Sequence, residues 1–243
     1  MLHNFAGNIE MYGVLDSIAS GPSEARTSEN STMVGVGMCM EGIEQNPVVY
    51  DLMPEMAFHH HKVDTKEWLN SYPRRRYGKL VPALQDAWRV LHHSIYNCTD
   101  GANDKNRDVI VAFPDVEPSV IWKEMSKSSN SQPISRQSSP LQISSSFDHP
   151  HLWYSTTDVI HALELFLTYG DEVSESSTFR YDLIDLTRQA LAKYGNEVFL
   201  KVIEAYTLND VNEVAAYSQR FLDIVEDLDT LLACHEGILL GLG

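Results

Sequence analysis

The sequence predicts an α/β region followed by an all-α region, with a polar segment between them. Over residues 1–96, patterns typical of helices border a short apolar run at 33–40, which is characteristic of a buried strand in a parallel sheet. Residues 97–150 contain a stretch at 126–146 rich in Ser, Gln, Pro and Asn, which predicts a flexible surface insertion. Over residues 151–243 apolar residues recur at spacings typical of amphipathic helices.

The first elements of the chain alternate between helix and strand. Apolar residues over 9–19 have helical spacing, and the Gly-Pro pair at 21–22 predicts the end of that helix. The run at 33–40 is predicted to be a buried strand. Within it, Gly35 and Gly37 are expected to leave space for a neighbouring group or a ligand.

Three further helices in the first region are marked by their terminal residues. Asn46 is the predicted N-cap of a helix that has a proline in its first turn and runs to about residue 58. Asp64 is the predicted cap of a second helix, and Gly78 lies directly after its end. Pro82 opens the third helix, whose apolar residues fall on one face.

The last region is predicted to be entirely helical. A threonine at 156 or 157 can cap a helix that ends near Gly170. A long amphipathic helix is predicted over 179–206, and Asn209 interrupts it. A last helix then runs to about residue 232. The predicted domains are therefore 1–96, 97–150 and 151–243.

Charge and hydropathy exclude two classes of partner. The formal net charge is -16, whereas proteins that bind nucleic acid need clustered Lys and Arg. The one basic run, Arg74 to Arg76, is interpreted as a solvated helix end. No apolar stretch approaches 18 residues, so no membrane span is predicted. The first residues also lack the basic and apolar parts of a signal peptide.

Two tripeptides fit the acceptor motif for N-linked glycans, with Asn30 and Asn97 as the acceptors. Such motifs also arise by chance in a Ser-rich chain, so on this ground alone the cellular compartment stays open. The three cysteines are too scattered for a disulfide framework or a zinc site. Three consecutive histidines at 59–61 cannot all face one ion, so no metal site is predicted.

Glu41 stands where a catalytic carboxylate of a (β/α)₈ barrel would stand. It directly follows the predicted strand and precedes a glycine and a capped helix, and the catalytic groups of such barrels lie where strands meet the following loops. A glutamate just before a helix also has a simpler role, because it favours the positive end of the helix dipole. Spacing alone leaves both interpretations open.

Several blocks of sequence, in a fixed order along the chain, add to the information from the Glu41 region. The blocks are Asn4-Phe-Ala-Gly-Asn8, Met11-Tyr-Gly-Val-Leu15, Asn30 to Asn46, Arg75-Arg-Tyr-Gly78, Tyr96-Asn-Cys98, Trp153-Tyr154 with Asp158, Phe179-Arg-Tyr-Asp-Leu183, and Asp185-Leu-Thr-Arg-Gln189. Together they resemble the α-N-acetylglucosaminidase family of glycoside hydrolases, particularly its plant members. The resemblance covers most of the chain except the Ser-rich insertion and the last dozen residues.

The resemblance implies a retaining exo-glycosidase that removes terminal α-linked N-acetylglucosamine, typically from heparan sulfate in the lysosome. It implies that Glu41 is the nucleophile and that no cofactor is needed. It also implies that Asn4 and Asn8 line the sugar pocket, although a purely structural role in a loop is an equally good interpretation of these two asparagines. The 2-acetamido group of an α-glucosaminide is cis to the leaving oxygen and cannot attack from behind. Retention therefore requires an enzyme carboxylate on the opposite face, with an acid/base carboxyl roughly 5–5.5 Å away.

The second carboxyl group departs from the family pattern. The resemblance implies an acid/base glutamate on an earlier barrel strand, and this chain begins downstream of that motif. The nearby Glu10, Glu44 and Glu55 do not match it. We therefore expect a fragment that holds the last two or three βα units of a (β/α)₈ barrel and a C-terminal helical domain, inactive alone. The parent enzyme is expected in the secretory pathway, in the lysosome, the vacuole or outside the cell. The alternative is a catalytically dead helical interaction module, and the oligomeric state stays open.

Overall fold

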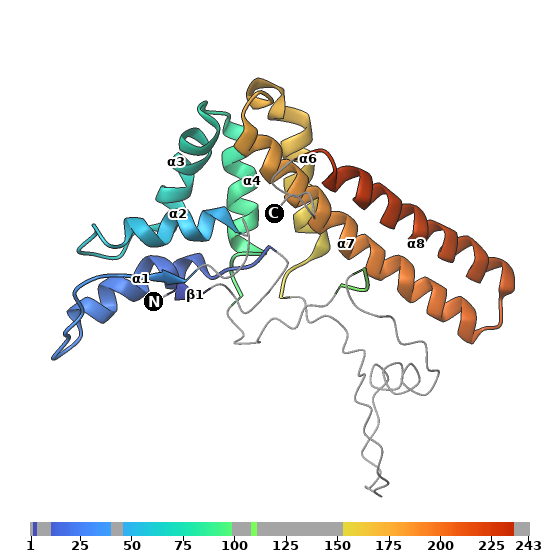
Figure 1. The fold of residues 1–243 in the computed structure, drawn as a ribbon, viewed down its shortest axis with the longest axis horizontal. Helices are drawn as coiled ribbons and strands as arrows, with labels where there is room; N and C mark the ends of the chain where they lie inside the picture. The colour runs from blue at the N-terminus through green and yellow to red at the C-terminus, as the bar shows by residue number, and fades with distance from the viewer. Residues whose placement is uncertain (1, 4–10, 40–45, 99–107, 111–152, 236–243) are drawn as a thin grey trace, which may run out of the picture. The chain divides into compact units, whose positions relative to one another are not determined.

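A computed structural model describes residues 2–3, 11–39, 46–98, 108–110 and 153–235, and the remaining residues are not considered structurally (Figure 1). The chain divides into two compact units. Unit 1 comprises Met1–Asn106, His151–Leu191 and Leu228–Gly243, and unit 2 comprises Arg107–Pro150 and Ala192–Asp227. Each unit is described by itself below.

Unit 1 begins with a short parallel β-α-β arrangement. Strand β1, Leu2–His3, pairs in parallel with strand β2, Met38–Cys39, and helix α1, Leu15–Thr27, lies between them in sequence. Leu2 is opposite Met38, and His3 is opposite Cys39. Parallel pairing through a crossover helix is the unit from which (β/α)₈ barrels are built. The described residues contain this one strand pair, so the larger part of a barrel is not confirmed.

The predicted strand at 33–40 is much shorter than expected, which corrects the prediction of a buried strand. In the described residues only Met38 and Cys39 are paired, and Val34 is fully exposed. A Cβ added to Gly35 or Gly37 would meet nothing within 4 Å, so these glycines face open space and not a tightly packed neighbour. The apolar composition was misleading because a strand is stabilised by partner strands, which residues 33–37 lack here.

The predicted first helix is displaced toward the C-terminus. Met11 is not helical, and α1 continues through Pro22 although a stop was expected there. Proline removes a backbone donor and normally ends a helix. Here Leu15, Ile18 and Pro22 are buried together on one face, and that burial outweighs the lost hydrogen bond.

Helices α2, Pro47–Glu55, α3, Thr65–Tyr77, and α4, Pro82–His93, follow as predicted. Asp64 caps α3, because its Oδ1 atom accepts hydrogen bonds from the amides of Lys66 at 2.9 Å and Glu67 at 3.1 Å. Gly78 follows α3 with a φ of 84°, the left-handed conformation expected after a helix. Both terminal predictions for α3 are confirmed.

The remaining helices are α6, Thr156–Tyr169, the 3₁₀ turn η1, Gly170–Val173, α7, Ser177–Thr207, and α8, Val211–Leu232. The cap of α6 is Ser155, one residue before the predicted threonine, and its Oγ atom accepts from the Thr157 amide at 3.3 Å. Asn209 separates α7 from α8 with a φ of 56°, as predicted. The helical character of the last region is confirmed.

The core of unit 1 is aromatic and joins α3, α4, α6 and the first part of α7. Helix α4 packs along both α3 and α6. Trp68 stacks on Tyr72 with ring centroids 4.9 Å apart, and Phe166 stacks on Phe179 at 5.6 Å. Tyr77 meets the Phe179 ring edge-on at 5.4 Å. Such contacts stabilise the packing beyond the burial of area alone.

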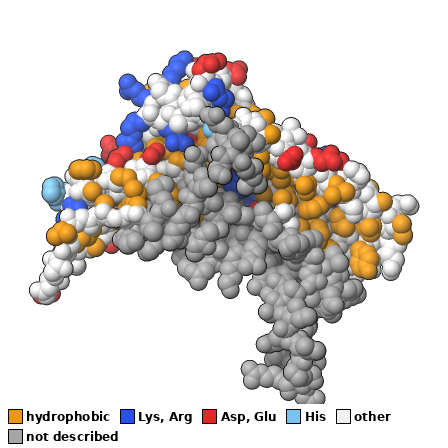
Figure 2. Space-filling view, in the orientation of Figure 1, with side chains coloured by type: hydrophobic (Ala, Val, Ile, Leu, Met, Phe, Trp, Pro, Cys, Tyr) orange, Lys and Arg blue, Asp and Glu red, His pale blue; other side chains and the backbone are white. Residues whose placement is uncertain are grey.

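Arg76 corrects the interpretation of the basic run as a solvated helix end. Its Nε and Nη2 atoms donate to the two carboxylate oxygens of Asp182 on α7, at 2.5 and 2.7 Å. The side chains of Arg76 and Asp182 are only 11% and 8% exposed. Arg74 and Arg75 do lie on the surface. Figure 2 shows several Lys and Arg side chains exposed in this part of the molecule. The run looked uniform in sequence, whereas its third residue faces the core.

No helix in the described ranges is long and apolar enough to cross a membrane.

Candidate functional site

The residues predicted to carry the chemistry, Glu41, Asn4 and Asn8, lie outside the described residues, as do Glu10 and Glu44. Their roles stay predictions. The described residues show how the two segments that contain them, 4–10 and 40–45, are attached to the fold.

The residues that precede the two segments lie side by side. Segment 4–10 follows β1 and segment 40–45 follows β2, and the last residues of these strands, His3 and Cys39, are directly opposite each other. Because β1 and β2 are parallel, the chain leaves both at the same edge of the pair. In α/β folds this edge, at the carboxyl ends of the strands, is where ligands bind.

Residues that follow the two segments are also joined, through Asn46. The Oδ1 atom of Asn46 accepts a hydrogen bond from the backbone amide of Tyr12 at 2.7 Å. It accepts a second from the hydroxyl of Tyr96 at 3.1 Å. Asn46 is the N-cap residue of α2, as predicted, but its side chain makes no capping hydrogen bond to that helix. Its oxygen instead accepts from residues distant in sequence, which a local sequence pattern could not indicate.

Close packing around Gly13 supports this junction. A Cβ at Gly13 would lie 2.8 Å from Val49 Cγ2 and 3.0 Å from Tyr96 Cδ1, closer than side-chain atoms approach each other. The backbone of Leu15 donates to the carbonyl of Tyr96 at 3.2 Å. The chain directly after segment 4–10 is thus held against both α2 and the end of α4, and only glycine fits at this point.

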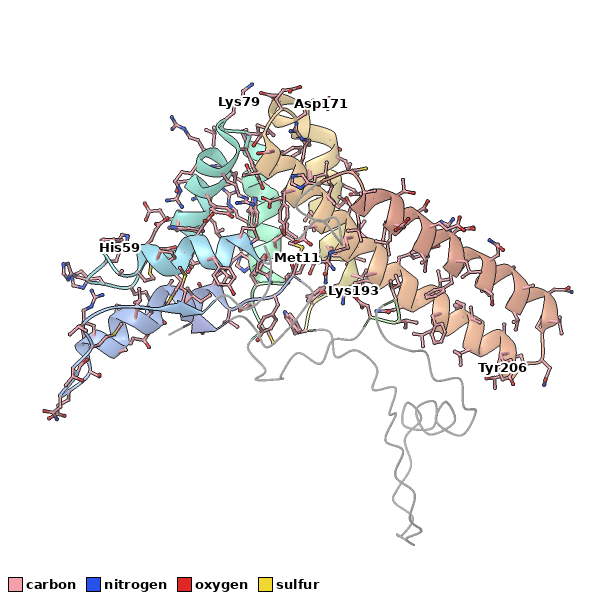
Figure 3. All side chains as sticks on the ribbon, viewed as in Figure 1. Met11, His59, Lys79, Asp171, Lys193 and Tyr206 are labelled. Atoms are coloured by element: carbon pink, nitrogen blue, oxygen red, sulfur yellow. The ribbon has the colours of Figure 1, made fainter. Side chains whose placement is uncertain are left out.

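Met11, labelled in Figure 3, is attached to α7 by a buried amide. Its backbone nitrogen donates to Gln189 Oε1 at 3.3 Å, and Gln189 Nε2 donates to the hydroxyl of Tyr154 at 2.8 Å. The ring of Trp153 meets that of Tyr12 edge-on at 5.4 Å. These residues belong to the sequence blocks that resemble the family, but the sequence did not predict that they contact one another. No sequence signal singles out Asn46 or Gln189, since both follow polar residues in the chain, and only the structure shows that they are buried.

A small cavity lies beside this junction, lined by Met11, Pro47, Tyr96, Asp182 and Asp185 among others. Its volume of about 10 Å³ is the size of one water molecule, so it cannot accept a sugar ring. Burial raises the pKa of the Tyr96 hydroxyl well above its ordinary value. Tyr96 is therefore neutral and acts as a hydrogen-bond donor to Asn46.

Glu55, one of the alternative acids, has a structural role. Its Oε2 atom accepts from Trp68 Nε1 at 2.7 Å, and Oε1 lies 3.2 Å from Arg75 Nη1. The guanidinium of Arg75 also lies 4.7 Å from the centre of the Trp68 ring. The three side chains join the end of α2 to α3, which accounts for Glu55 without catalysis.

The two predicted glycan acceptors differ in their surroundings. Asn30 is exposed in a turn with a φ of 61°, whereas Asn97 is half-buried and its backbone forms an antiparallel bridge with Val14. Among the described residues no group of three His, Cys, Asp or Glu side chains is placed to hold a metal ion.

Comparison with known families agrees with the blocks described above. The family model "Alpha-N-acetylglucosaminidase (NAGLU) C-terminal domain" matches residues 68–242, and the model "Alpha-N-acetylglucosaminidase (NAGLU) tim-barrel domain" matches residues 1–60. The chain belongs to the α-N-acetylglucosaminidase family. It is therefore a member of a family of glycoside hydrolases, as the sequence analysis expected.

A human enzyme is similar to this chain over nearly its whole length. The chain is 36% identical over 243 residues to the α-N-acetylglucosaminidase of Homo sapiens, a match that covers 99% of this chain and 29% of the human protein. The chain thus spans less than a third of the length of that relative.

Solved structures of family 89 glycoside hydrolases from Clostridium perfringens have a similar fold. One, in complex with 2-acetamido-1,2-dideoxynojirimycin, is 25% identical with a TM-score of 0.75, covering 96% of this chain and 24% of that chain. Another is 26% identical with a TM-score of 0.74 and the same coverage; in it two glutamates are changed to glutamine, and it binds its substrate GlcNAc-α-1,4-galactose.

Proposed function

We propose that this chain forms the nucleophile-bearing part of a retaining exo-α-N-acetylglucosaminidase. The substrate class is glycans that end in α-linked N-acetylglucosamine, heparan sulfate among them. Family membership supports the reaction, and the observation that carries the site is the paired attachment of segments 4–10 and 40–45. Asn4, Asn8 and Glu41 belong to these two segments, and we propose that they share one sugar pocket.

In this proposal Glu41 attacks the anomeric carbon from the face opposite the leaving oxygen and forms a covalent glycosyl-enzyme intermediate. An acid/base carboxyl protonates the leaving oxygen and then activates the water that releases the sugar. The 2-acetamido group is on the wrong face to replace Glu41. Neither step requires a cofactor.

We propose that the chain is divided into the three domains that its sequence predicts. Residues 1–96 are the C-terminal portion of a (β/α)₈ barrel, residues 97–150 are a loop with a Ser-rich insertion, and residues 151–243 are a truncated helical domain. The parallel strand pair and the crossover helix α1 support the barrel assignment. We also propose glycans at Asn30 and Asn97 and a secretory destination for the parent enzyme, either the lysosome, the vacuole or the cell exterior.

Because the chain spans 29% of its human relative, we expect no turnover from these 243 residues alone. The test is hydrolysis of a chromogenic α-N-acetylglucosaminide by this chain and by the full-length protein that contains it. We expect activity in the full-length protein, with a loss of at least about 1000-fold on Glu41→Gln, since removal of a nucleophile leaves only binding and electrostatic effects.

A matched control is Glu55→Gln, because Glu55 contacts Trp68 and Arg75 and is expected to affect stability only. Turnover by the isolated chain, or full activity of the Glu41→Gln variant, would contradict the proposal. A full-length protein without any activity would favour the second candidate function.

That second candidate is a helical module that binds a protein partner without turnover. One observation favours it: unit 2 exposes large apolar side chains on α7, on α8 and in the turn between them. These include Tyr206, Leu208, Val211 and Leu222, which are 54%, 70%, 78% and 54% exposed. Figure 2 shows apolar atoms over both helices, and Tyr206 lies at the end of α7 (Figure 3). Apolar patches of this kind often mark interaction surfaces.

A further inference from the structure

Helix α8 has two apolar stripes, and the first of them is covered. Within unit 2 this first stripe consists of Val214, Tyr217, Phe221 and Ile224, all buried or half-buried. Phe221 packs on Phe199 of α7 with ring centroids 5.7 Å apart, and Figure 1 shows α8 running back along α7. The contact identifies the side of α8 that faces α7. The spacing of three and four residues is that of one face of a helix.

The second stripe lies on another side of α8 and is exposed. It consists of Val211, Ala215, Ser218, Leu222 and Val225, with Ser218 half-buried. Val211, Leu222 and Val225 are 78%, 54% and 37% exposed. Leu222 is rotated by about 160° from the buried Ile224, since successive residues of an α-helix are about 100° apart. The alternating spacing of four and three residues is that of the seam between two packed helices.

The polar residues beside this exposed stripe are neutral or acidic. By their positions on the helix, one edge of the stripe is followed by Asn212, Gln219, Asp223 and Glu226. Gln219 Nε2 donates to Asp223 Oδ1 at 2.9 Å. Helix α8 has five acidic residues and one basic residue, Arg220. The guanidinium of Arg220 lies 5.7 Å from the centre of the Tyr194 ring on α7, and therefore on another side of the helix.

We propose that the exposed stripe of α8 binds a basic amphipathic helix of a protein partner. The apolar side chains of the stripe pack against those of the partner helix, as in other helix–helix contacts. The carboxylates of Asp223 and Glu226 face Lys or Arg residues beside the partner's apolar residues, which orients the partner. The inference does not depend on hydrolase activity, and it gives the surface exposed by unit 2 a partner of definite chemistry.

The charge of α8 argues against three other occupants. A second copy of α8 would bring two acidic helices together, each with a single arginine, and like charges disfavour such a pair. Anionic lipid surfaces and nucleic acids are repelled for the same reason. The net charge of -16 on the whole chain adds to this repulsion. A cationic helix is attracted by both the charge and the apolar residues.

The probe is a synthetic amphipathic helix of Leu and Lys, with Leu at spacings of three and four residues. A charge-reversed peptide has Glu in place of each Lys. Binding to the full-length protein that contains this chain is measured by calorimetry. We expect a Kd of about 1–100 µM for the Lys peptide, because a contact along one helix is small. The Glu peptide should bind at least about tenfold more weakly, since its charge is that of α8.

Leu222→Asp distinguishes binding at the stripe from a general attraction to an acidic protein. It adds a negative charge, so a general attraction predicts equal or tighter binding of the Lys peptide. Loss of the central apolar residue instead predicts binding weakened by at least about tenfold. The matched control is Leu167→Asp on α6 in unit 1, where the leucine is 60% exposed. This control should change the Kd less than about twofold, because exposed charges far from a contact are screened.

Val211→Asp repeats the test at the start of α8, where an acidic residue favours the helix dipole. It should weaken binding by about threefold or more, since Val211 is at the end of the stripe and not at its centre. Circular dichroism checks that each variant is folded, and Val211→Asp decides the test if Leu222→Asp does not fold. Turnover of the chromogenic substrate is measured on the same samples and should be unchanged in both variants.

Four outcomes would overturn the proposal. They are no binding of the Lys peptide, equal binding of both peptides, unchanged or tighter binding in the folded stripe variants, and equal weakening by Leu167→Asp. Oligomers, or sedimentation with phosphatidylcholine vesicles, that are lost in Leu222→Asp would assign the stripe to a second copy or to a membrane and overturn it as well. A wild type that binds the Lys peptide without turnover would refute the hydrolase function alone.

Discussion

The side chain of His92 is almost completely buried on α4 of unit 1. Its Nε2 atom lies 3.3 Å from Asp16 Oδ1, and its Nδ1 atom has no hydrogen-bond partner among the described residues. His93 and Lys66 are the nearby groups that can carry positive charge. Burial lowers the pKa of His92 below its ordinary value of 6.5, and the Asp16 carboxylate opposes this shift without cancelling it.

This shift predicts a loss of stability on acidification. Because the folded pKa is below 6.5, the unfolded chain takes up the proton first as the pH falls, so the free energy of unfolding declines below about pH 6.5, by at most about 1.4 kcal/mol per pH unit for one proton. Urea unfolding between pH 7.5 and 5.0 should show a steeper decline for wild type than for His92→Gln. Parallel pH profiles would contradict this assignment. Asp16 acts in a separate window, below pH 3.8: burial opposes a lower pKa for its carboxyl group, but the interactions with Thr65 and His92 prevail.

At the level of elements, the junction between α6 and η1 requires glycine at position 170, because any larger residue would clash with a neighbouring ring. Gly170 lies against Phe179 of α7, and a Cβ there would meet the ring at 2.2 Å. Phe179 cannot retreat easily, since it stacks on Phe166 and meets Tyr77 edge-on. Gly21 in the middle of α1 is the opposite case, with nothing within 4 Å of an added Cβ.

The same substitution should therefore have opposite effects at these two glycines. Gly170→Ala should destabilise unit 1 by about 1–3 kcal/mol through overpacking. Gly21→Ala should stabilise it by about 0.5–1 kcal/mol, because alanine is the better helix former. Chemical denaturation of both variants measures the difference, and a stabilised Gly170→Ala variant would show that Phe179 has room to move.

At the level of the whole molecule, the described part of each compact unit contains a deeply buried ion pair. Asp182 binds Arg76 in unit 1 and also accepts from the Tyr77 hydroxyl at 2.7 Å. In unit 2 the ammonium of Lys193, labelled in Figure 3, lies 3.0 Å from Asp108 Oδ1, and Asn196 donates to the same atom. The backbone amide of Val109 in turn donates to Asn196 Oδ1 at 2.9 Å, which attaches residues 108–110 to α7.

Removal of one partner from either pair should leave a buried charge and cost about 3–5 kcal/mol. We expect the damage to be confined to the unit that holds the pair. In amide exchange, Asp182→Asn should deprotect α3 and α4, whereas Lys193→Met should deprotect residues 196–226. Equal deprotection of both units by either variant would show that the two units unfold as one.

Several features were predictable from sequence because their causes are local. The cap at Asp64, the stop at Gly78 and the break at Asn209 all depend on the conformational preferences of one residue and on amides two or three positions away. The amphipathic helices α4, α7 and α8 follow from periodicity, which needs no knowledge of the partner.

Other features depend on contacts between distant segments. The sequence by itself determined the family and the candidate nucleophile Glu41, because ordered blocks of residue types survive in the linear order of the chain. Only the tertiary structure decided that Pro22 lies inside a helix, that Arg76 pairs with Asp182, and that the side-chain oxygen of Asn46 accepts from Tyr12 and not from the amides of α2. The physical reason is the same in each case. A local preference of about 1–3 kcal/mol, the upper value being that of proline inside a helix, is overridden when burial or a buried hydrogen bond involves residues far apart in sequence.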